Sequence, residues 1–302
     1  MNNFKNKLEK PVADNWYITG LVDAEGSFGV AISKNASRTL GYIVSVSFEI
    51  ALQASDKHIL EILKSVFGVG GVYKHGSDMY RYKVSSIKDI VTAIIPHFDK
   101  FPLVTQKRAD FLLFKAIITI LSKGVLNKEG LQEIVSYKAV LNRGLSTALK
   151  SAFPDTVPYI RPKIAFNGTF NPEWVRGFTE GEGSFFVSLT KNSRFKTGVE
   201  VRLGFSLTQH SRDMILLQGI ESFFGCGKSL LRSGSLAGDY KVSSVKDLSE
   251  IIIPFFEKYP FLGTKMRGFQ ILCLVVNIVK EKGHLTEEGL NIIRNIKSQT
   301  SI

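Results

Sequence analysis

Strict alternation of apolar and polar residues marks the early part of the chain. Phe28, Val30 and Ile32 alternate with small or polar residues, and residues 43–50 alternate in the same way after a polar turn at residues 34–39. A period of two is typical of a strand with one buried face, so this segment is predicted to form a half-buried β-hairpin. The following patterns predict a helix at residues 55–67, strands near residues 72–75 and 80–84, and a long apolar helix at residues 107–121.

Short signals predict where several helices begin and end. Asn171 precedes a proline suited to the first helical position, and Ser86 and Ser244 each stand three residues before an acid, as in a capping box. The helices that precede the two hairpins are predicted to end at Gly26 and Gly183, in the left-handed conformation that commonly stops a helix.

The whole pattern occurs twice. Residues 20–28, GLVDAEGSF, correspond to residues 177–185, GFTEGEGSF, and the correspondence continues to the end of both halves with only small insertions. A repeat of this length indicates two copies of one structural unit. We therefore predict an α+β fold of two pseudo-symmetric αββαββα repeats, each a four-stranded antiparallel sheet with helices on one face. The first repeat is expected at residues 1–150, a proline-containing linker at 151–170, and the second repeat at 171–302.

Composition narrows the class of partner. The 302 residues carry a formal net charge of +12, which favours a polyanion, either nucleic acid or an anionic membrane surface, over a basic protein without such a partner. No apolar run approaches the roughly 18 residues of a membrane span, and no targeting segment is visible. The two cysteines, Cys226 and Cys273, have no metal-binding spacing and suit a reducing compartment.

The uncovered sheet faces are candidates for contact with nucleic acid. An ordinary solvated face is the alternative, but two such faces related by a pseudo-two-fold axis would form a saddle that suits the major groove of double-stranded DNA. The DNA-contacting residues predicted in the first repeat are Ser27, Gly29, Ala31, Ser33, Asn35, Arg38, Ile43, Ser45, Ser47, Glu49, Arg81 and Lys83. Those predicted in the second are Ser184, Phe186, Ser188, Thr190, Asn192, Glu200, Arg202, Ser206, Thr208, Lys228, Arg232 and Lys241.

The repeated motif also suggests chemistry. Gly20 and Gly177 lie inside helices, where glycine costs about 1 kcal/mol relative to alanine, so a close approach of the two helix backbones is expected there. That packing would bring Glu25 and Glu182 side by side at helix C-termini, where carboxylates oppose the helix dipole unless a cation is present. Hard divalent cations such as Mg²⁺ accept carboxylate, carbonyl and phosphate oxygens.

The carbonyl groups of Ala24 and Gly181 are expected to be further ligands of the metal. Beneath a DNA-binding face, such a site is typical of a phosphodiester hydrolase. The alternative is that both acids merely decorate helix ends.

On these motifs the chain resembles the monomeric, two-repeat LAGLIDADG homing endonucleases, and the resemblance extends over both repeats. It implies a monomer that cleaves a long asymmetric DNA target and leaves short 3′ overhangs. It also implies Glu25 and Glu182 as ligands of the catalytic Mg²⁺, with Ca²⁺ able to occupy the site without supporting cleavage. This chain departs from the motif by having Glu instead of Asp at both positions, a longer side chain of equal charge.

The resemblance implies auxiliary catalytic residues as well. Lys107 and Lys265 precede matching long helices, where phosphate contact is the alternative role, and Gln209 follows a strand of the second repeat. The first repeat has Leu52 at the position matching Gln209, so the two DNA strands are expected to be cut at different rates.

Three functions remain open at this point: a homing endonuclease, an RNA maturase that assists intron splicing, and a DNA-binding protein that does not cleave. Retention of both acids favours the first, with intron RNA as a possible further partner. The resemblance also implies a mitochondrial or other organellar location, and neither a membrane nor a protein partner is expected.

Overall fold

The computed structural model describes residues 13–166 and 168–298. By its contacts the chain divides into two compact units, one formed by residues up to 24 together with those from 168 onward, the other by residues 25–167. Helix α1 (Asn15–Glu25) therefore packs, through Ala24, in the unit that contains the second repeat. The sequence repeat and the compact unit thus do not share a boundary.

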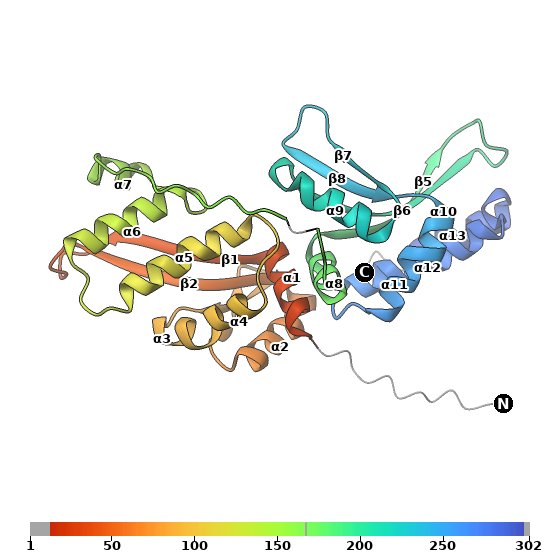
Figure 1. The fold of residues 1–302 in the computed structure, drawn as a ribbon. Helices are drawn as coiled ribbons and strands as arrows, with labels where there is room; N and C mark the ends of the chain where they lie inside the picture. Colours follow the sequence, from red (N-terminus) through yellow and green to blue (C-terminus); the bar gives the residue numbers. More distant parts are fainter. Residues whose placement is uncertain (1–12, 167, 299–302) are drawn as a thin grey trace. The chain divides into compact units, whose positions relative to one another are not determined.

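The unit of residues 25–167 contains an antiparallel sheet of strand order β1-β2-β4-β3 (Figure 1). Register pairs Phe28 with Phe48 and Phe48 with Val84, which places the predicted apolar set on one face. The strands are β1 (Gly26–Lys34), β2 (Tyr42–Gln53), β3 (Gly71–His75) and β4 (Met79–Val84), and the helices are α2 (Lys57–Phe67), α3 (Ile87–Asp89), α4 (Ile95–Lys100), α5 (Lys107–Leu121), α6 (Lys128–Val140) and α7 (Thr147–Ala152).

The other unit repeats this arrangement with strand order β5-β6-β8-β7, so the predicted fold class is confirmed (Figure 1). Its strands are β5 (Gly183–Lys191), β6 (Val199–His210), β7 (Lys228–Leu231) and β8 (Ala237–Val242). Its helices, besides α1, are α8 (Pro172–Glu182), α9 (Met214–Phe224), α10 (Val245–Asp247), α11 (Ile253–Lys258), α12 (Lys265–Lys280) and α13 (Glu287–Ser298). Within the described residues, no helix is both long enough and apolar enough to span a bilayer.

Matching phenylalanine clusters join each sheet to its covering helices. The ring of Phe28 lies 5.5 Å from that of Phe48 and 5.4 Å from that of Phe111 on α5. In the second unit Phe185 lies 5.0 Å from Phe205, and the ring of Phe269 on α12 also packs against it. Helices α2 and α5 contact the first sheet, and α8, α9 and α12 contact the second. Among the described residues, Ser27 and Ser184 point away from the apolar set of their strands and are exposed, as expected of an uncovered face.

The predicted helix caps are confirmed, but the predicted glycine stop is wrong. The Ser86 and Ser244 side chains accept hydrogen bonds from backbone N–H groups three residues on, and Asn171 caps α8. Gly183 however has φ −74° and ψ 148°, and Gly26 is not in the left-handed region either. The chain passes straight from helix to strand, and glycine is required at 183 because an added Cβ would lie 2.4 Å from the Thr179 side chain.

The predicted linker is held against helices of the first unit over much of its length. The Ser136 hydroxyl on α6 donates to the Val157 carbonyl at 2.6 Å. Arg161 forms a 2.7 Å ion pair with Asp110 on α5 and also donates to the Val140 carbonyl. Composition predicted a segment without regular structure, and these bonds hold it in one course along α5 and α6.

Candidate functional site: motif helices and open sheet faces

The two motif helices pack backbone to backbone. A Cβ added to Gly20 would lie 2.1 Å from the Trp174 carbonyl oxygen, and one added to Gly177 would lie 2.0 Å from the Tyr17 carbonyl oxygen. Real Cβ atoms do not approach so closely, so only glycine allows this contact between α1 and α8. The predicted close approach of the helices is confirmed.

Reciprocal hydrogen bonds join the same two helices. The Tyr17 hydroxyl on α1 donates to Glu180 Oε2 at 3.2 Å, and Trp174 Nε1 on α8 donates to Asp23 Oδ2 at 2.8 Å. Tyr17 and Trp174 occupy matching positions in the two repeats, as do Asp23 and Glu180. Both acids are buried, so these bonds satisfy carboxylate oxygens that would otherwise be costly to bury.

At the C-terminal end of α8, a lysine lies against the backbone beside the predicted metal ligand. Lys265 is the first residue of α12, and its Nζ donates to the Gly181 carbonyl at 3.4 Å and to the Gly183 carbonyl. Glu182, half-buried, stands between these two glycines in the chain. Three predicted site residues, Gly181, Glu182 and Lys265, are thus brought together in this unit.

The corresponding residues of the first motif lie at comparable positions along their own elements. Glu25 is exposed at the end of α1, Ala24 precedes it, and Lys107 is the first residue of α5. The expectation that Glu25 meets Glu182 stays a prediction.

The carboxylate of Glu182 and the last carbonyl groups of α8 are oxygen ligands, the kind that a hard cation prefers. The last carbonyl groups of a helix have no intrahelical partner, so they can accept from other groups. Within residues 13–166 and 168–298 no group of three or more His, Cys, Asp or Glu side chains is arranged for a metal. Glu182 and the nearby carbonyl groups therefore fit a hard divalent cation only as part of a ligand set.

Gln209 was predicted to follow a strand, but it lies within β6, and Leu52 occupies the matching position within β2. Gln209 pairs with Gly238, and an added Cβ on Gly238 would meet Met214 and Leu217 of α9. Cross-strand partners share a face, so register puts Gln209 on the helix-covered face of β6, where it is half-buried. Its catalytic role stays a prediction.

An ion-pair cluster occupies the open face of the first sheet. Glu49 on β2 accepts from Arg81 at 2.8 Å and from Lys83 at 2.9 Å, both on β4. Burial alone would raise the pKa of Glu49, but hydrogen bonds from Lys83 and Ser47 and the nearby charge of Arg81 lower it overall. Glu49 therefore holds two other residues predicted to contact DNA, Arg81 and Lys83, through ion pairs.

Similar pairs lie on the open face of the second sheet. Asp239 on β8 accepts from Arg232 at 2.7 Å and from the Thr208 hydroxyl at 2.6 Å. The hydrogen bond from Arg232 holds the pKa of Asp239 below its usual value. Glu200 likewise binds Arg202 at 2.9 Å. Asp239 was not among the predicted site residues, although it alternates along β8 with Lys241, which was predicted on the open face.

Two of the predicted DNA contacts also build turns. The Asn35 side chain accepts from the Ser37 N–H at 3.0 Å, and Asn192 accepts from the Arg194 N–H at 3.1 Å. Each turn is closed by a glycine with positive φ, Gly41 or Gly198. These side-chain oxygens shape the hairpin tips that carry Arg38 and Arg194.

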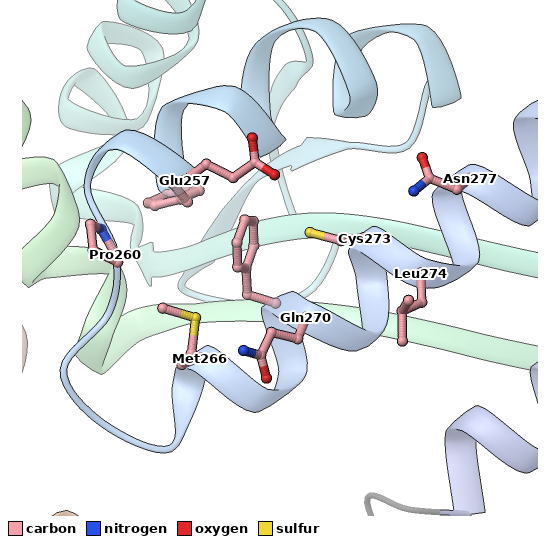
Figure 2. Close-up of a pocket in the computed structure, with 9 residues that line it drawn as sticks. Glu257, Pro260, Met266, Gln270, Cys273, Leu274 and Asn277 are labelled. Carbon is pink, nitrogen blue, oxygen red and sulfur yellow. The ribbon is translucent and has the colours of Figure 1, made fainter. Parts of the chain in front are cut away.

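A cavity of about 550 Å³ lies between α11 and α12, and none of the residues that line it was predicted as a site residue (Figure 2). Its walls are largely apolar, and the polar lining residues are Glu257, Gln270, Cys273 and Asn277. Burial, with a smaller contribution from Glu257, raises the pKa of Cys273 to about 12.

The fold and the repeated motif define a two-repeat α+β protein whose motif helices end in carboxylates beside open, charged sheet faces. The chain belongs to the LAGLIDADG endonuclease family, whose sequence model matches residues 18–118 and again residues 175–276. It is 36% identical over 282 residues to the probable intron-encoded endonuclease 3 of Neurospora crassa, and the match covers 92% of this chain. The same match covers 52% of that relative, so this chain spans about half of its length.

Solved structures of DNA-bound family members are similar over nearly the whole chain. The I-SmaMI LAGLIDADG homing endonuclease bound to cleaved DNA has 38% identity and a TM-score of 0.92, covering 96% of this chain and 97% of that chain. I-LtrWI bound to its target DNA has 43% identity and a TM-score of 0.91, covering 94% and 96%. A further structure of I-SmaMI holds an uncleaved DNA target in the presence of calcium ions.

Proposed function

We propose that this protein is a site-specific homing endonuclease that makes a metal-dependent double-strand break in a long asymmetric DNA target and leaves short 3′ overhangs. The observation that carries the proposal is the end of α8, where Glu182 lies between two glycines whose carbonyl groups accept from Lys265. A protein that only binds DNA has no need of a carboxylate and an ammonium group at this place. The DNA-bound relatives support the partner class.

In this proposal each motif acid, Glu25 and Glu182, is a ligand of a divalent ion, with Ala24 and Gly181 contributing carbonyl oxygens. When bound, such an ion would supply Lewis-acid stabilisation of the phosphate and would activate a water. The ammonium group of Lys265 stabilises negative charge on the phosphate, and Lys107 does so in the other repeat. Mg²⁺ is the expected ion, because the donors are all oxygens.

The open faces are proposed to contact the duplex. Guanidinium groups such as Arg81 and Arg232, each held by a carboxylate, suit bidentate contact with guanine, while exposed lysines such as Lys228 suit phosphate contact. The two faces differ in most of their side chains, which fits a target without symmetry. The difference between Leu52 and Gln209 is proposed to make the two strands break at different rates.

We further propose that the chain works as a monomer in a mitochondrion or other organelle, as the family resemblance implies. The intron-encoded relative supports an origin within an intron.

The decisive experiment incubates the purified chain with a plasmid library of random inserts, with and without Mg²⁺. Linear products are expected only with the metal, and sequencing of their ends would give the target and the overhang. Glu182→Gln and Glu25→Gln should each abolish the double-strand break while leaving DNA affinity, measured in Ca²⁺, within a few-fold of the wild type.

Glu61→Gln is the matched control, because Glu61 is a half-exposed acid on α2 in a weak 3.8 Å pair with Lys57. It should cut like the wild type. Absence of any linear product at all Mg²⁺ concentrations, or unchanged cleavage by the Glu182→Gln variant, would refute the proposal.

A further inference from the structure

The loop before α12 is fastened to α8 by two side chains one helical turn apart. Arg176, which is 2% exposed, donates from Nη1 to the Pro260 carbonyl at 3.0 Å. Glu180 accepts from the Leu262 N–H at 2.8 Å and from the Gly263 N–H at 3.2 Å, one on each carboxylate oxygen. Residues at i and i+4 share a helix face, so both side chains hold the same loop.

Glu180 is itself held in place. Its Oε2 also accepts from the Tyr17 hydroxyl, and the residue is only 9% exposed. The guanidinium group of Arg176 lies 4.4 Å from the centre of the Tyr17 ring. A buried carboxylate that accepts from both α1 and the 262–263 loop has one defined position, and this position in turn fixes the loop.

The loop ends where Lys265 begins. Two residues after Gly263, α12 starts with Lys265, whose ammonium group reaches back to the Gly181 and Gly183 carbonyls. Glu180 and Gly181 are neighbours on α8. The first accepts hydrogen bonds from the loop, and the second accepts one from Lys265 at the start of α12, so both ends of the segment 262–265 are bound to α8. A shift of the loop would move the lysine relative to Glu182.

We propose that Glu180 is a positioning residue that holds the 262–263 loop and thereby places the Lys265 ammonium group beside Glu182. The inference rests on the proposed nuclease function, and it assigns to the first acid of the second motif a role distinct from metal binding. The reason is geometric, because both oxygens of Glu180 are occupied by N–H and O–H donors. Asp23 at the matching position of the first motif likewise accepts from a buried donor, Trp174 Nε1.

The test compares Glu180→Gln with Lys265→Met in single-turnover cleavage, with each DNA strand labelled separately. Gln replaces one acceptor oxygen by a donor, so it cannot receive both backbone N–H groups. Loss of Lys265 identifies the strand that depends on it, and Glu180→Gln should slow the same strand about 10- to 100-fold, the usual effect of removing a supporting hydrogen bond near a metal site. The other strand should stay within about two-fold of the wild type.

The double variant Glu180→Gln/Lys265→Met distinguishes positioning from a general loss of structure. If Glu180 acts through Lys265, the double variant should be no slower than Lys265→Met alone. Hydrogen exchange of the Leu262 and Gly263 amides gives a readout independent of cleavage, and both should exchange faster in Glu180→Gln. Equal slowing of both strands, additive effects in the double variant, or unchanged amide exchange would overturn the inference.

Variants with smaller expected effects keep the inference testable if Glu180→Gln does not fold. Tyr17→Phe removes the bond from the Tyr17 hydroxyl but leaves those from the loop, so it should slow the Lys265-dependent strand less than Glu180→Gln does. Glu180→Asp should recover part of the lost rate. Asp213→Asn, another buried acid of the same unit at 6% exposure, is the control and should leave the ratio of the strand rates unchanged. A wild-type chain that cuts neither strand overturns the proposed function, whereas equal cutting by wild type and Glu180→Gln overturns only this inference.

Discussion

Replacement of Gly177 by alanine should reverse the usual sign of that substitution in a helix. In an open helix, glycine to alanine stabilises by about 1 kcal/mol. Here the new Cβ would lie 2.0 Å from the Tyr17 carbonyl oxygen, and ordinary C···O contacts are about 3.3 Å or longer. The helices α1 and α8 would have to separate by about 1.3 Å to restore that contact.

Overpacking of this kind typically costs about 1–3 kcal/mol, and the separation would also stretch the Tyr17–Glu180 and Trp174–Asp23 hydrogen bonds. We therefore expect Gly177→Ala to lower the free energy of unfolding of this unit by about 1–3 kcal/mol. Gly20→Ala should behave in the same way, since its Cβ would lie 2.1 Å from the Trp174 carbonyl oxygen.

Urea unfolding followed by tryptophan fluorescence suits the measurement. The only tryptophans of the chain, Trp16 and Trp174, lie on α1 and α8, so the signal reports on this unit. Gly268→Ala on α12 is the matched control, because its Cβ would have nothing closer than 3.9 Å and should bring the ordinary gain. The reasoning is refuted if Gly177→Ala raises the urea midpoint as Gly268→Ala does.

Two further predictions concern titratable groups in the same unit. Because its pKa is depressed by Arg232, Asp239 should stabilise the fold by no more than about 1 kcal/mol above pH 4, and this contribution should disappear as the pH falls through its lowered pKa. The difference in melting temperature between wild type and Asp239→Asn should then be constant from pH 7 to 5 and shrink below pH 4; a difference that grows on acidification would contradict the assignment. Because its pKa is near 12, Cys273 should react with iodoacetamide at pH 8 far more slowly in the folded protein than in urea. Mass spectrometry measures both rates, and equal rates would show that burial does not suppress the thiolate.

Local patterns in the sequence predicted most of the fold correctly. Alternation placed the strands because a period of two matches the side-chain repeat of a strand with one buried face and does not match that of a helix. The long helix α5 begins and ends at the predicted residues 107 and 121. Because the sequence repeats, an element predicted in one half was also expected at the matching position of the other half. The motif glycines could be assigned to close helix packing because their cost inside a helix requires a compensating contact.

The errors and omissions arise where one residue type serves several physical needs. Gly183 was predicted to supply a left-handed turn, whereas it is required by the approach of Thr179. Glu180 and Asp239 were missed because their roles depend on which loop or strand lies opposite, and no local period encodes that. The backbone N–H groups that donate hydrogen bonds to Glu180 belong to residues more than 80 positions away in the sequence.

The contact between α1 and α8, which we call the seam, includes Gly20, Gly177 and the Tyr17–Glu180 and Trp174–Asp23 hydrogen bonds. It explains why the two copies of the motif differ at some positions and not at others. The glycines are fixed, since any side chain there would meet a backbone carbonyl group. Around them the copies differ in size but not in kind: Tyr17 and Trp174 both donate, and Asp23 and Glu180 both accept. A shorter acid facing Trp174 and a longer one facing Tyr17 keep the two bonds at 2.8 and 3.2 Å, so the seam can be preserved while its two ends diverge. In the proposed nuclease, this freedom would let the ends of α1 and α8 differ from each other, as an asymmetric target requires.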